Sequence, residues 1–365
     1  MQKTSAPTQQ TVRIGYVPLV DAAPLIIAKE AGFFLEENLD IVLHRESNWA
    51  SIRDKLSLGL IDAAHMLAPM VFASHITPPN SHHDKSFMTA MALGYNGNAI
   101  TLSNPLFDEL NAEGKSLDEI LAALKAYVDA SESKLTFGSV HPFSMHTNLL
   151  LLLLKRAGID KDKIEIKVIP PVRMVDAIRD GLVDLFCVGE PWNTAAQFEK
   201  AGKIICYGSD LWSHAPEKVL GLNSKFARQN RETHIKVLRA IVRACQWLEE
   251  PDHMAQAALW LASKRYLDCS SDLLLHAMVN QWQNQANGSA QRKIFFSQNA
   301  NAPWPQHAKW ISDAIFNPRN TFATDGQWLT PPDQIYDWEI FSQVMTSLGL
   351  PVPNTDDCPG TLPKL

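Results

Sequence analysis

The chain has 365 residues, of which 46% are hydrophobic and 20% are charged, and its formal net charge is −6. This length is too great for one ordinary compact domain and suits two α/β lobes, each with a core of its own. A nucleic-acid-binding protein usually carries a basic face, and Lys and Arg form no run longer than a pair here. We therefore expect no direct binding of DNA or RNA, and a small ligand fits better.

In the first part of the chain, short strands alternate with helices. Residues 12–17 alternate as a strand does, and a turn at 18–21 leads to a helix over 22–34. Ser51 and Asp54 resemble a capping box that opens the next helix. The other expected elements are strands at 41–43, 62–66 and 87–93, an apolar helix from residue 69, a polar loop at 76–86, a turn at 95–98 and an extended crossing at 99–102.

The middle of the chain repeats this alternation and then returns to the first lobe. We expect helices at 116–130, 141–157 and 172–180, strands at 135–140, 164–169, 184–188 and 204–207, and a return crossing near 209–218. Later helices are expected at 231–249, 252–264, 270–284 and 303–316. Such alternation predicts parallel sheets with helices on both faces, whose ligands bind at the carboxyl ends of the strands. Two lobes of this kind can face each other across a cleft that closes about a hinge.

Cysteine usage and the N-terminus predict the location of the protein. The five cysteines are scattered and form no CxxC pair, which argues against a disulfide framework and a zinc site. The first eleven residues are polar, whereas a secretory signal needs an apolar stretch. The sequence therefore predicts a cytoplasmic protein with reduced thiols. Residues 135–154 lack acidic and basic side chains, but Gly, Pro, His, Ser and Asn interrupt them, so a strand and a buried helix are favoured over a membrane span.

The common catalytic signatures do not occur in this sequence. GxGxxG, GxxxxGK(S/T), GxSxG, HExxH and DxDxDG are all absent. His82 and His83 are adjacent in a polar loop, which is not the i, i+4 spacing of paired metal ligands. No nucleophile, base and orienting group come together. We therefore expect a binding protein and not an enzyme, without a cofactor and without a metal.

Hydrogen-bond donors, in contrast, occur at predicted strand ends and helix starts. Trp49 offers an indole N–H, Asn96 and Gly97 offer amide donors, His146 can donate, and Lys218 supplies a cation at the return crossing. A donor-only lining with one cation suits a small oxyanion. Simpler interpretations also exist: Trp49 can be a packing residue, Lys218 a solvated surface charge, and His146 a histidine at a helix start.

Six motifs occur in a specific order along the chain. They are Gly15-Tyr16-Val17-Pro18-Leu19-x-Asp21-Ala22-Ala23-Pro24, Trp49-x-x-x-Arg53-Asp54, Asp62-Ala63-Ala64-His65-Met66, Gly97-Asn98, Val188-Gly189-Glu190-Pro191-Trp192-Asn193 and Pro216-Glu217-Lys218-Val219-Leu220. Each motif is weak alone. The ordered set resembles the nitrate-binding family of ABC-transporter periplasmic proteins, from about residue 12 to residue 320.

The resemblance implies an α/β fold with two lobes, of the periplasmic-binding-protein-like type II, with an interlobe cleft and a C-terminal helical extension. With the predicted crossings, lobe 1 comprises residues 12–98 and 215–350, lobe 2 comprises 99–214, and 351–365 form a surface tail.

The resemblance also implies site residues. Trp49 matches the anion-contacting Trp of the family, His146 the His beside the anion, and Lys218 the Lys that carries the positive charge. Bicarbonate-binding relatives have a carboxylate and calcium in place of this Lys, so Lys218 implies nitrate or nitrite without a metal. The remaining implied ligand-binding residues are Gly97, Gly189 and Glu190 of the cleft motifs, and Asn96, at or next to a position where transporter proteins have Gln.

Without an export signal, the chain resembles the NasS branch of cytoplasmic nitrate/nitrite sensors within this family. Members of that branch hold an RNA-binding, NasT-like antiterminator inactive until the anion arrives, so the resemblance implies a sensor of nitrate assimilation with such a partner. The Trp-rich stretch 282–338 and the loop 76–86 are candidate partner surfaces. Two alternatives remain: the substrate-binding component of a nitrate/nitrite ABC transporter, which requires export, and an enzyme on the same fold.

Overall fold

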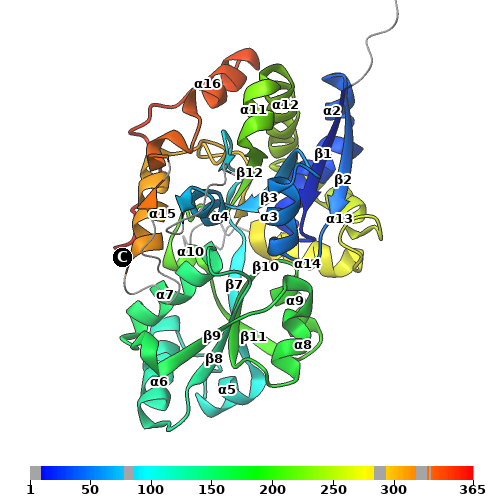
Figure 1. Cartoon of the computed structure of the whole chain (residues 1–365). Coiled ribbons are helices and arrows are strands. Elements are labelled where there is room, and N and C mark those ends of the chain that lie inside the picture. The colour runs from blue at the N-terminus through cyan, green and yellow to red at the C-terminus, as the bar shows by residue number, and fades with distance from the viewer. Residues whose placement is uncertain (1–9, 78–85, 283–292, 318–326, 329, 365) are drawn as a thin grey trace, which may run out of the picture.

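Two five-stranded sheets organise the chain, one in each lobe (Figure 1). The computed structural model describes residues 10–77, 86–282, 293–317, 327–328 and 330–364. The sheet of lobe 1 has the order β2-β1-β3-β12-β5. Its strands are β1 (Gln10–Tyr16), β2 (Leu39–Arg45), β3 (Ala63–Leu67), β5 (Phe87–Met88) and β12 (Lys218–Asn223). The sheet of lobe 2 has the order β11-β7-β10-β8-β9. Its strands are β7 (Asn98–Ser103), β8 (Leu135–Ser139), β9 (Ile164–Val168), β10 (Leu185–Gly189) and β11 (Gly202–Tyr207).

Helices cover both sheets, as the alternating sequence pattern predicts. Lobe 1 carries η1 (Val20–Ala22), α1 (Ala23–Glu30), α2 (Phe33–Glu36), α3 (Trp49–Ser57), α4 (Ala68–Ala73), α11 (Ser224–Gln229), α12 (Arg231–Leu248), η4 (Pro251–His253), α13 (Met254–Ala262), α14 (Ser271–Trp282), α15 (Pro305–Phe316), η5 (Pro332–Gln334) and α16 (Trp338–Ser347). Lobe 2 carries α5 (Asn104–Glu109), α6 (Leu117–Ala130), α7 (Met145–Ala157), η2 (Lys161–Lys163), η3 (Pro171–Arg173), α8 (Met174–Arg179), α9 (Trp192–Phe198) and α10 (Gly208–Leu211). Two pairs of two-residue strands complete the set: β4 (Ile76–Thr77) pairs with β14 (Gln327–Trp328), and β6 (Tyr95–Asn96) pairs with β13 (Lys293–Ile294).

The prediction of parallel sheets is wrong in one respect, because both sheets are mixed. Strand β7 runs antiparallel to β10 and β11, and β12 runs antiparallel to β3 and β5. These are the two strands by which the chain enters a lobe from the other lobe. The parallel strands of each lobe end at the junction between the lobes, and a crossing strand starts there, so it runs in the opposite direction.

Local capping shifts several predicted helix starts. Asn48, rather than Ser51, caps α3, since its Oδ1 accepts the Ser51 N–H at 2.9 Å. Trp49 is consequently the first residue of a helix. Ser144 caps α7 by accepting the Thr147 N–H at 3.1 Å, so this helix starts after the predicted His-Pro turn. Each cap satisfies an N–H that the first turn of a helix leaves free.

Two further differences concern continuity. The predicted helix over 22–34 is divided into η1, α1 and α2, and the residue before α2, Gly32, has a φ of +81°. The strand expected at 87–93 is regular only over β5. Helix α7 has 13 residues, and among the described residues no helix is long and apolar enough to cross a membrane.

The two crossings between the lobes are tied together by Asn96. Its backbone φ is +60°, in the left-handed region that Asn tolerates better than most residues. Its side-chain N–H donates to the carbonyl of Ser213 at 2.7 Å, and its Oδ1 accepts the N–H of Ala215 at 3.0 Å. The buried amide of Asn96 therefore serves the hinge, because it joins the outgoing crossing to the returning one.

We expect Asn96→Ala to lower the free energy of unfolding by about 2–4 kcal/mol, since it removes both side-chain hydrogen bonds that join the two crossings. Asn38→Ala is the matched control: Asn38 also has a positive φ, of 57°, but is exposed. Asn38→Ala should lower the free energy of unfolding only by the strain of an alanine at positive φ, about 1–2 kcal/mol. Urea unfolding measures both, and equal losses for the two variants would remove the hinge role of Asn96.

Candidate functional site

A group of buried charges lies where the two lobes meet. The Asp21 carboxylate, on η1 directly after β1, is within 3.0 Å of Lys218 Nζ and 2.8 Å of Lys293 Nζ. Lys218 Nζ is also 3.1 Å from the Glu217 carboxylate. All four side chains are fully buried or nearly so. Asp21, Glu217, Lys218 and Lys293, which we call the Asp21 cluster, come from three separate parts of the chain: η1, the start of β12 and β13.

Two glycines allow lobe 2 to approach Asp21 closely. A Cβ atom on Gly97 would lie 2.9 Å from Asp21 Oδ1, and one on Gly189 would lie 2.8 Å from Asp21 Oδ2. Beside them the Val20 N–H donates to the carbonyl of Glu190 at 2.8 Å, which is a direct backbone bond between the lobes. Gly97 and Gly189 therefore contribute to the site by their lack of a side chain.

Four further residues bring buried polar atoms that have no hydrogen-bond partner among the described residues. These atoms are Trp49 Nε1, both ring nitrogens of His65 and of His146, and the side-chain amide of Asn98. We call these four residues the unpaired set; they come from α3, β3, α7 and β7, and so from both lobes. The rings of Trp49 and His65 are 5.2 Å apart. Buried polar groups are nearly always hydrogen-bonded, so a set of unpaired ones on facing elements indicates a ligand site.

Electrostatic interactions place the two histidines of the unpaired set beside the Asp21 cluster. Burial lowers the pKa of His65 to about 3, helped by the positive charges of Lys218 and Lys293 and opposed by Asp21. Burial also lowers the pKa of His146 well below its usual range, and Lys218 adds to the effect. Both imidazoles are therefore neutral at physiological pH, so each ring has one N–H donor and one acceptor nitrogen.

The Asp21 cluster carries a net charge that depends on Glu217. Burial disfavours the Asp21 carboxylate, but Lys218 and Lys293 outweigh this effect and lower the pKa of Asp21. For Lys218, burial is outweighed by the two carboxylates, which raise its pKa. Burial raises the pKa of Glu217 to about 7, against the attraction of Lys218. The cluster as a whole is thus neutral when Glu217 is ionised and has one positive charge when Glu217 is protonated.

Of the predicted site residues, the structure places His146 beside Lys218, and Trp49 beside His65, which is itself close to Lys218. The interpretation of Lys218 as a solvated surface charge is wrong, because its side chain is fully buried. The expected donor-only lining is also wrong, since the carboxylates of Asp21 and Glu217 contact this lysine.

Two other predicted residues have different surroundings. The Glu190 carboxylate accepts the Thr194 N–H at 3.1 Å, near the start of α9. The amide of Asn96 bonds to the hinge, and Asn98, two residues further on, contributes the unpaired amide. We therefore reassign the predicted amide contact from Asn96 to Asn98.

Sequence reasoning missed His65, Asn98, Glu217 and Lys293 as site residues, and named Asp21 only in passing. Three of the four missed residues lie inside or beside motifs already noted: His65 in the third, Asn98 directly after Gly97 and Glu217 directly before Lys218. Lys293 had no local signal, because it lies 75 residues after Lys218 in the sequence.

Comparison with known proteins identifies the family. The sequence model of the NMT1-like family matches residues 5–262. The nitrate/nitrite binding protein NrtA of Nostoc sp. (strain PCC 7120) is 33% identical over 323 residues, which are 84% of this chain and 71% of that protein. The bicarbonate transport ATP-binding protein CmpC of Synechocystis sp. (strain PCC 6803) is 33% identical over 356 residues, 93% of this chain and 50% of that protein. The chain thus spans about half the length of this second relative.

Solved structures share the arrangement of the elements. The periplasmic nitrate-binding protein NrtA from Synechocystis PCC 6803 superposes with a TM-score of 0.81 at 23% identity, covering 97% of this chain and 92% of that one. The alkanesulfonate-binding protein SsuA from Xanthomonas axonopodis pv. citri, bound to MOPS, gives a TM-score of 0.65 at 16% identity, covering 90% and 99%. The chain therefore belongs to the NMT1-like family and has the α/β periplasmic-binding-protein-like fold.

Proposed function

We propose that the chain is a receptor, without catalytic activity, that closes its lobes on nitrate or nitrite. The observation that supports this proposal is the unpaired set of buried polar groups around Lys218. A planar anion with two or three oxygens can accept hydrogen bonds from the Trp49 indole, the Asn98 amide and the two imidazoles. An anion in this position is also attracted to the Asp21 cluster when the cluster is positively charged. The similarity to proteins named for nitrate and nitrite binding agrees with this choice of ligand.

The finer proposal is that the chain is a cytoplasmic sensor that releases a NasT-like antiterminator when the anion binds. The ordered motifs of the nitrate-binding family support the anion-binding step on which this role depends. Ligand binding would shift the population from open to closed lobes, and the partner would distinguish the two states. Size-exclusion profiles of the mixture with the antiterminator should change when nitrate or nitrite is added, and an unresponsive profile would remove the sensor role.

The alternative is that the chain feeds a nitrate/nitrite transporter. It is favoured by relatives that are named as ATP-binding proteins of nitrate import and bicarbonate transport. Both roles require anion binding at the same place. Calorimetric titrations with nitrate, nitrite, sulfate, and bicarbonate with and without calcium show which anion binds. The experiment with the antiterminator then distinguishes the sensor role from the transport role.

The first prediction concerns Lys218 and Trp49. Nitrate has four heavy atoms, and at about −1.5 kcal/mol per atom its affinity reaches at best roughly tens of micromolar. We expect Lys218→Ala to weaken nitrate binding by about ten- to a hundredfold, because it removes a charged contact. Trp49→Phe, which keeps a ring but lacks the N–H, should weaken it by about two- to tenfold.

Lys203→Ala is the control for these variants, since Lys203 is an exposed residue on β11. Calorimetric titration of all three proteins with nitrate, after their folding is checked by circular dichroism, gives the dissociation constants. Unchanged titrations for Lys218→Ala and Trp49→Phe would place the anion elsewhere.

The second prediction concerns pH. Glu217 has its pKa raised to about 7 by burial, and an anion nearby favours its protonated form. Anion binding should therefore be tighter below pH 7, where Glu217 is neutral, and weaker above it. If the bound anion raises the pKa of Glu217 by about one unit, the two limits differ about tenfold in affinity. Glu217→Gln should bind at the low-pH affinity throughout, and a wild-type affinity that is flat between pH 6 and pH 8 would contradict the coupling.

The third prediction concerns Lys293, which shares Asp21 with Lys218. Without Lys293, Asp21 pairs with Lys218 alone, and the cluster loses one positive charge. We expect Lys293→Met to weaken nitrate binding by about tenfold or more. Lys309→Met, at an exposed lysine of α15, is the matched control. Equal nitrate affinities of the two variants, measured by calorimetry, would show that Lys293 has no part in anion binding.

A further inference from the structure

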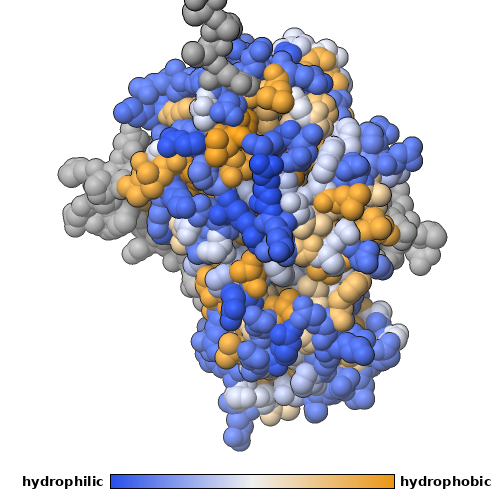
Figure 2. All heavy atoms as spheres, turned by 90° about the vertical axis from the view of Figure 1, so that its right-hand side faces the viewer, coloured by the Kyte–Doolittle hydropathy of each residue, from blue (hydrophilic) through white to orange (hydrophobic). Residues whose placement is uncertain are grey.

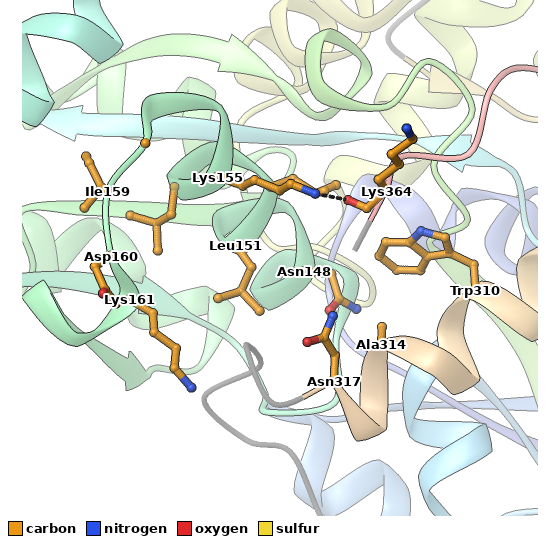
Figure 3. A pocket seen from close by; sticks show the side chains of 13 residues that line it. Asn148, Leu151, Lys155, Ile159, Asp160, Lys161, Trp310, Ala314, Asn317 and Lys364 are labelled. Atoms are coloured by element: carbon orange, nitrogen blue, oxygen red, sulfur yellow. Dashed lines mark hydrogen bonds between the residues drawn. The ribbon is translucent and has the colours of Figure 1, made fainter.

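We propose that a groove between α7 and α15 is a docking surface for an acidic, amphipathic segment of a protein partner, and that anion binding changes the shape of this groove. The inference rests on the proposed receptor function, because it names the surface on which the bound state is detected. The interlobe groove, as we call it, has a cavity of about 490 Å³ (Figure 3). Its walls include Leu151, Leu152 and Lys155 of α7, and Trp310 and Ala314 of α15.

The groove is formed by both lobes. Helix α7 packs on α6 of lobe 2, whereas α15 packs on α4 of lobe 1. Figure 1 shows α15 directly above α7 on one side of the molecule. Because the two walls belong to different lobes, any movement of one lobe against the other changes the width of the groove. Its shape can thus report whether the lobes are closed.

Helix α7 connects the groove to the anion site. His146, a member of the unpaired set, is the second residue of α7, and Leu151 and Lys155 follow on the same helix. Nine residues of helix separate His146 from Lys155, or about 14 Å. A helix of this length moves as a rigid unit, so a displacement of His146 toward an anion also displaces this wall of the groove.

The C-terminal segment links the two walls. Trp310 Nε1 of α15 donates to the carbonyl of Pro363 at 2.7 Å, and Lys155 Nζ of α7 donates to the carbonyl of Lys364 at 2.9 Å. Gln306 Nε2 donates to the carbonyl of Thr355 at 2.7 Å, further back along the same segment. The predicted surface tail is therefore attached along α15 and reaches α7 at its end, as Figure 3 shows for Lys155 and Lys364.

The chemistry of the lining indicates the occupant. The floor is aliphatic and aromatic, and Leu151 and Leu152 are only half-buried. Among the described lining residues, the lysines Lys155, Lys161 and Lys364 outnumber the one carboxylate, Asp160, in a chain whose net charge is −6. An apolar groove with a basic rim is complementary to a helix that has aliphatic side chains on one face and carboxylates beside them. The lining residues of α7 extend from Asn148 to Lys155, about 10 Å of helix, which matches two turns of such a partner.

Other apolar surfaces fit this role less well. On the face shown in Figure 2, hydrophobic residues lie in scattered groups among polar ones. Single exposed leucines such as Leu58 and Leu182 are common on protein surfaces and do not indicate a partner.

The test uses the full chain and a NasT-like antiterminator as the probe, without nitrate. Leu151→Glu and Lys161→Glu both place a negative charge against an acidic partner and should weaken its binding at least tenfold, with nitrate affinity unchanged. The matched controls, Leu182→Glu and Lys203→Glu, change exposed residues of lobe 2 outside the groove and should bind the antiterminator like the wild type. If both groove variants bind the antiterminator as tightly as the wild type, the docking proposal is wrong while the sensor role stands.

If the wild type itself does not bind the antiterminator, the sensor role fails and the groove is tested separately. The probe is then a synthetic helical peptide with leucines on one face and glutamates beside them, compared with a version that has lysines in place of the glutamates. The proposal requires that the acidic peptide binds more tightly and that Leu151→Glu abolishes this binding. Equal binding of the two peptides, no binding of either, or a dimer of the chain that Leu151→Glu dissociates, would overturn it.

Discussion

The sharing of Asp21 between Lys218 and Lys293 is the interaction on which the rest of the structure depends. Removing charges from water costs several kcal/mol for each ion unless they are paired with good geometry. Here that pairing needs three segments at once, because Asp21 follows β1, Lys218 begins β12 and Lys293 begins β13. The same carboxylate is approached by the ends of β7 and β10 through Gly97 and Gly189. The carboxylate of Asp21 therefore holds both lobes and the C-terminal extension together, because separating them would leave a buried charge without a partner.

This arrangement explains why closure would depend on a ligand. In this structure, the donors of Trp49, Asn98 and His146 are buried without hydrogen-bond partners among the described residues. Each buried polar group left in this condition costs about 1–3 kcal/mol. Water satisfies these groups when the lobes are open, and an anion with several acceptor oxygens would satisfy them when the lobes are closed. The free energy that separates the two states is therefore set by the ligand, which is the condition for a population shift.

The accuracy of each sequence prediction depends on how many residues its signal spans. Periodicity and capping residues act over a few positions, so the helices α6, α12 and α15 lie within two residues of their predicted bounds. Trp49 and Lys218 were identified because motifs surround them, whereas His146 was identified by its match to the family's His. The choice between Asn96 and Asn98 depends on one left-handed residue at the hinge, and the pairing of Lys293 with Asp21 joins positions 272 residues apart. Such contacts are decided by tertiary packing, which no local pattern contains.

The same distinction applies to the partner surface. The loop 76–86 proposed from the sequence lies mostly outside the described residues, as do parts of the Trp-rich stretch 282–338. The described tryptophans of this stretch differ in their environment. Trp304 is fully buried and packs against Trp338, so it supports the core of the extension, whereas Trp310 lines a groove that ends at α7. A partner that detects anion binding must contact an element whose position depends on the anion. Helix α7 meets this requirement, because His146 at its start belongs to the unpaired set and Leu151 and Lys155 along it face the groove. The number of tryptophans in the extension therefore indicates packing. Trp310 is relevant to the proposed signalling because it lines the groove beside α7.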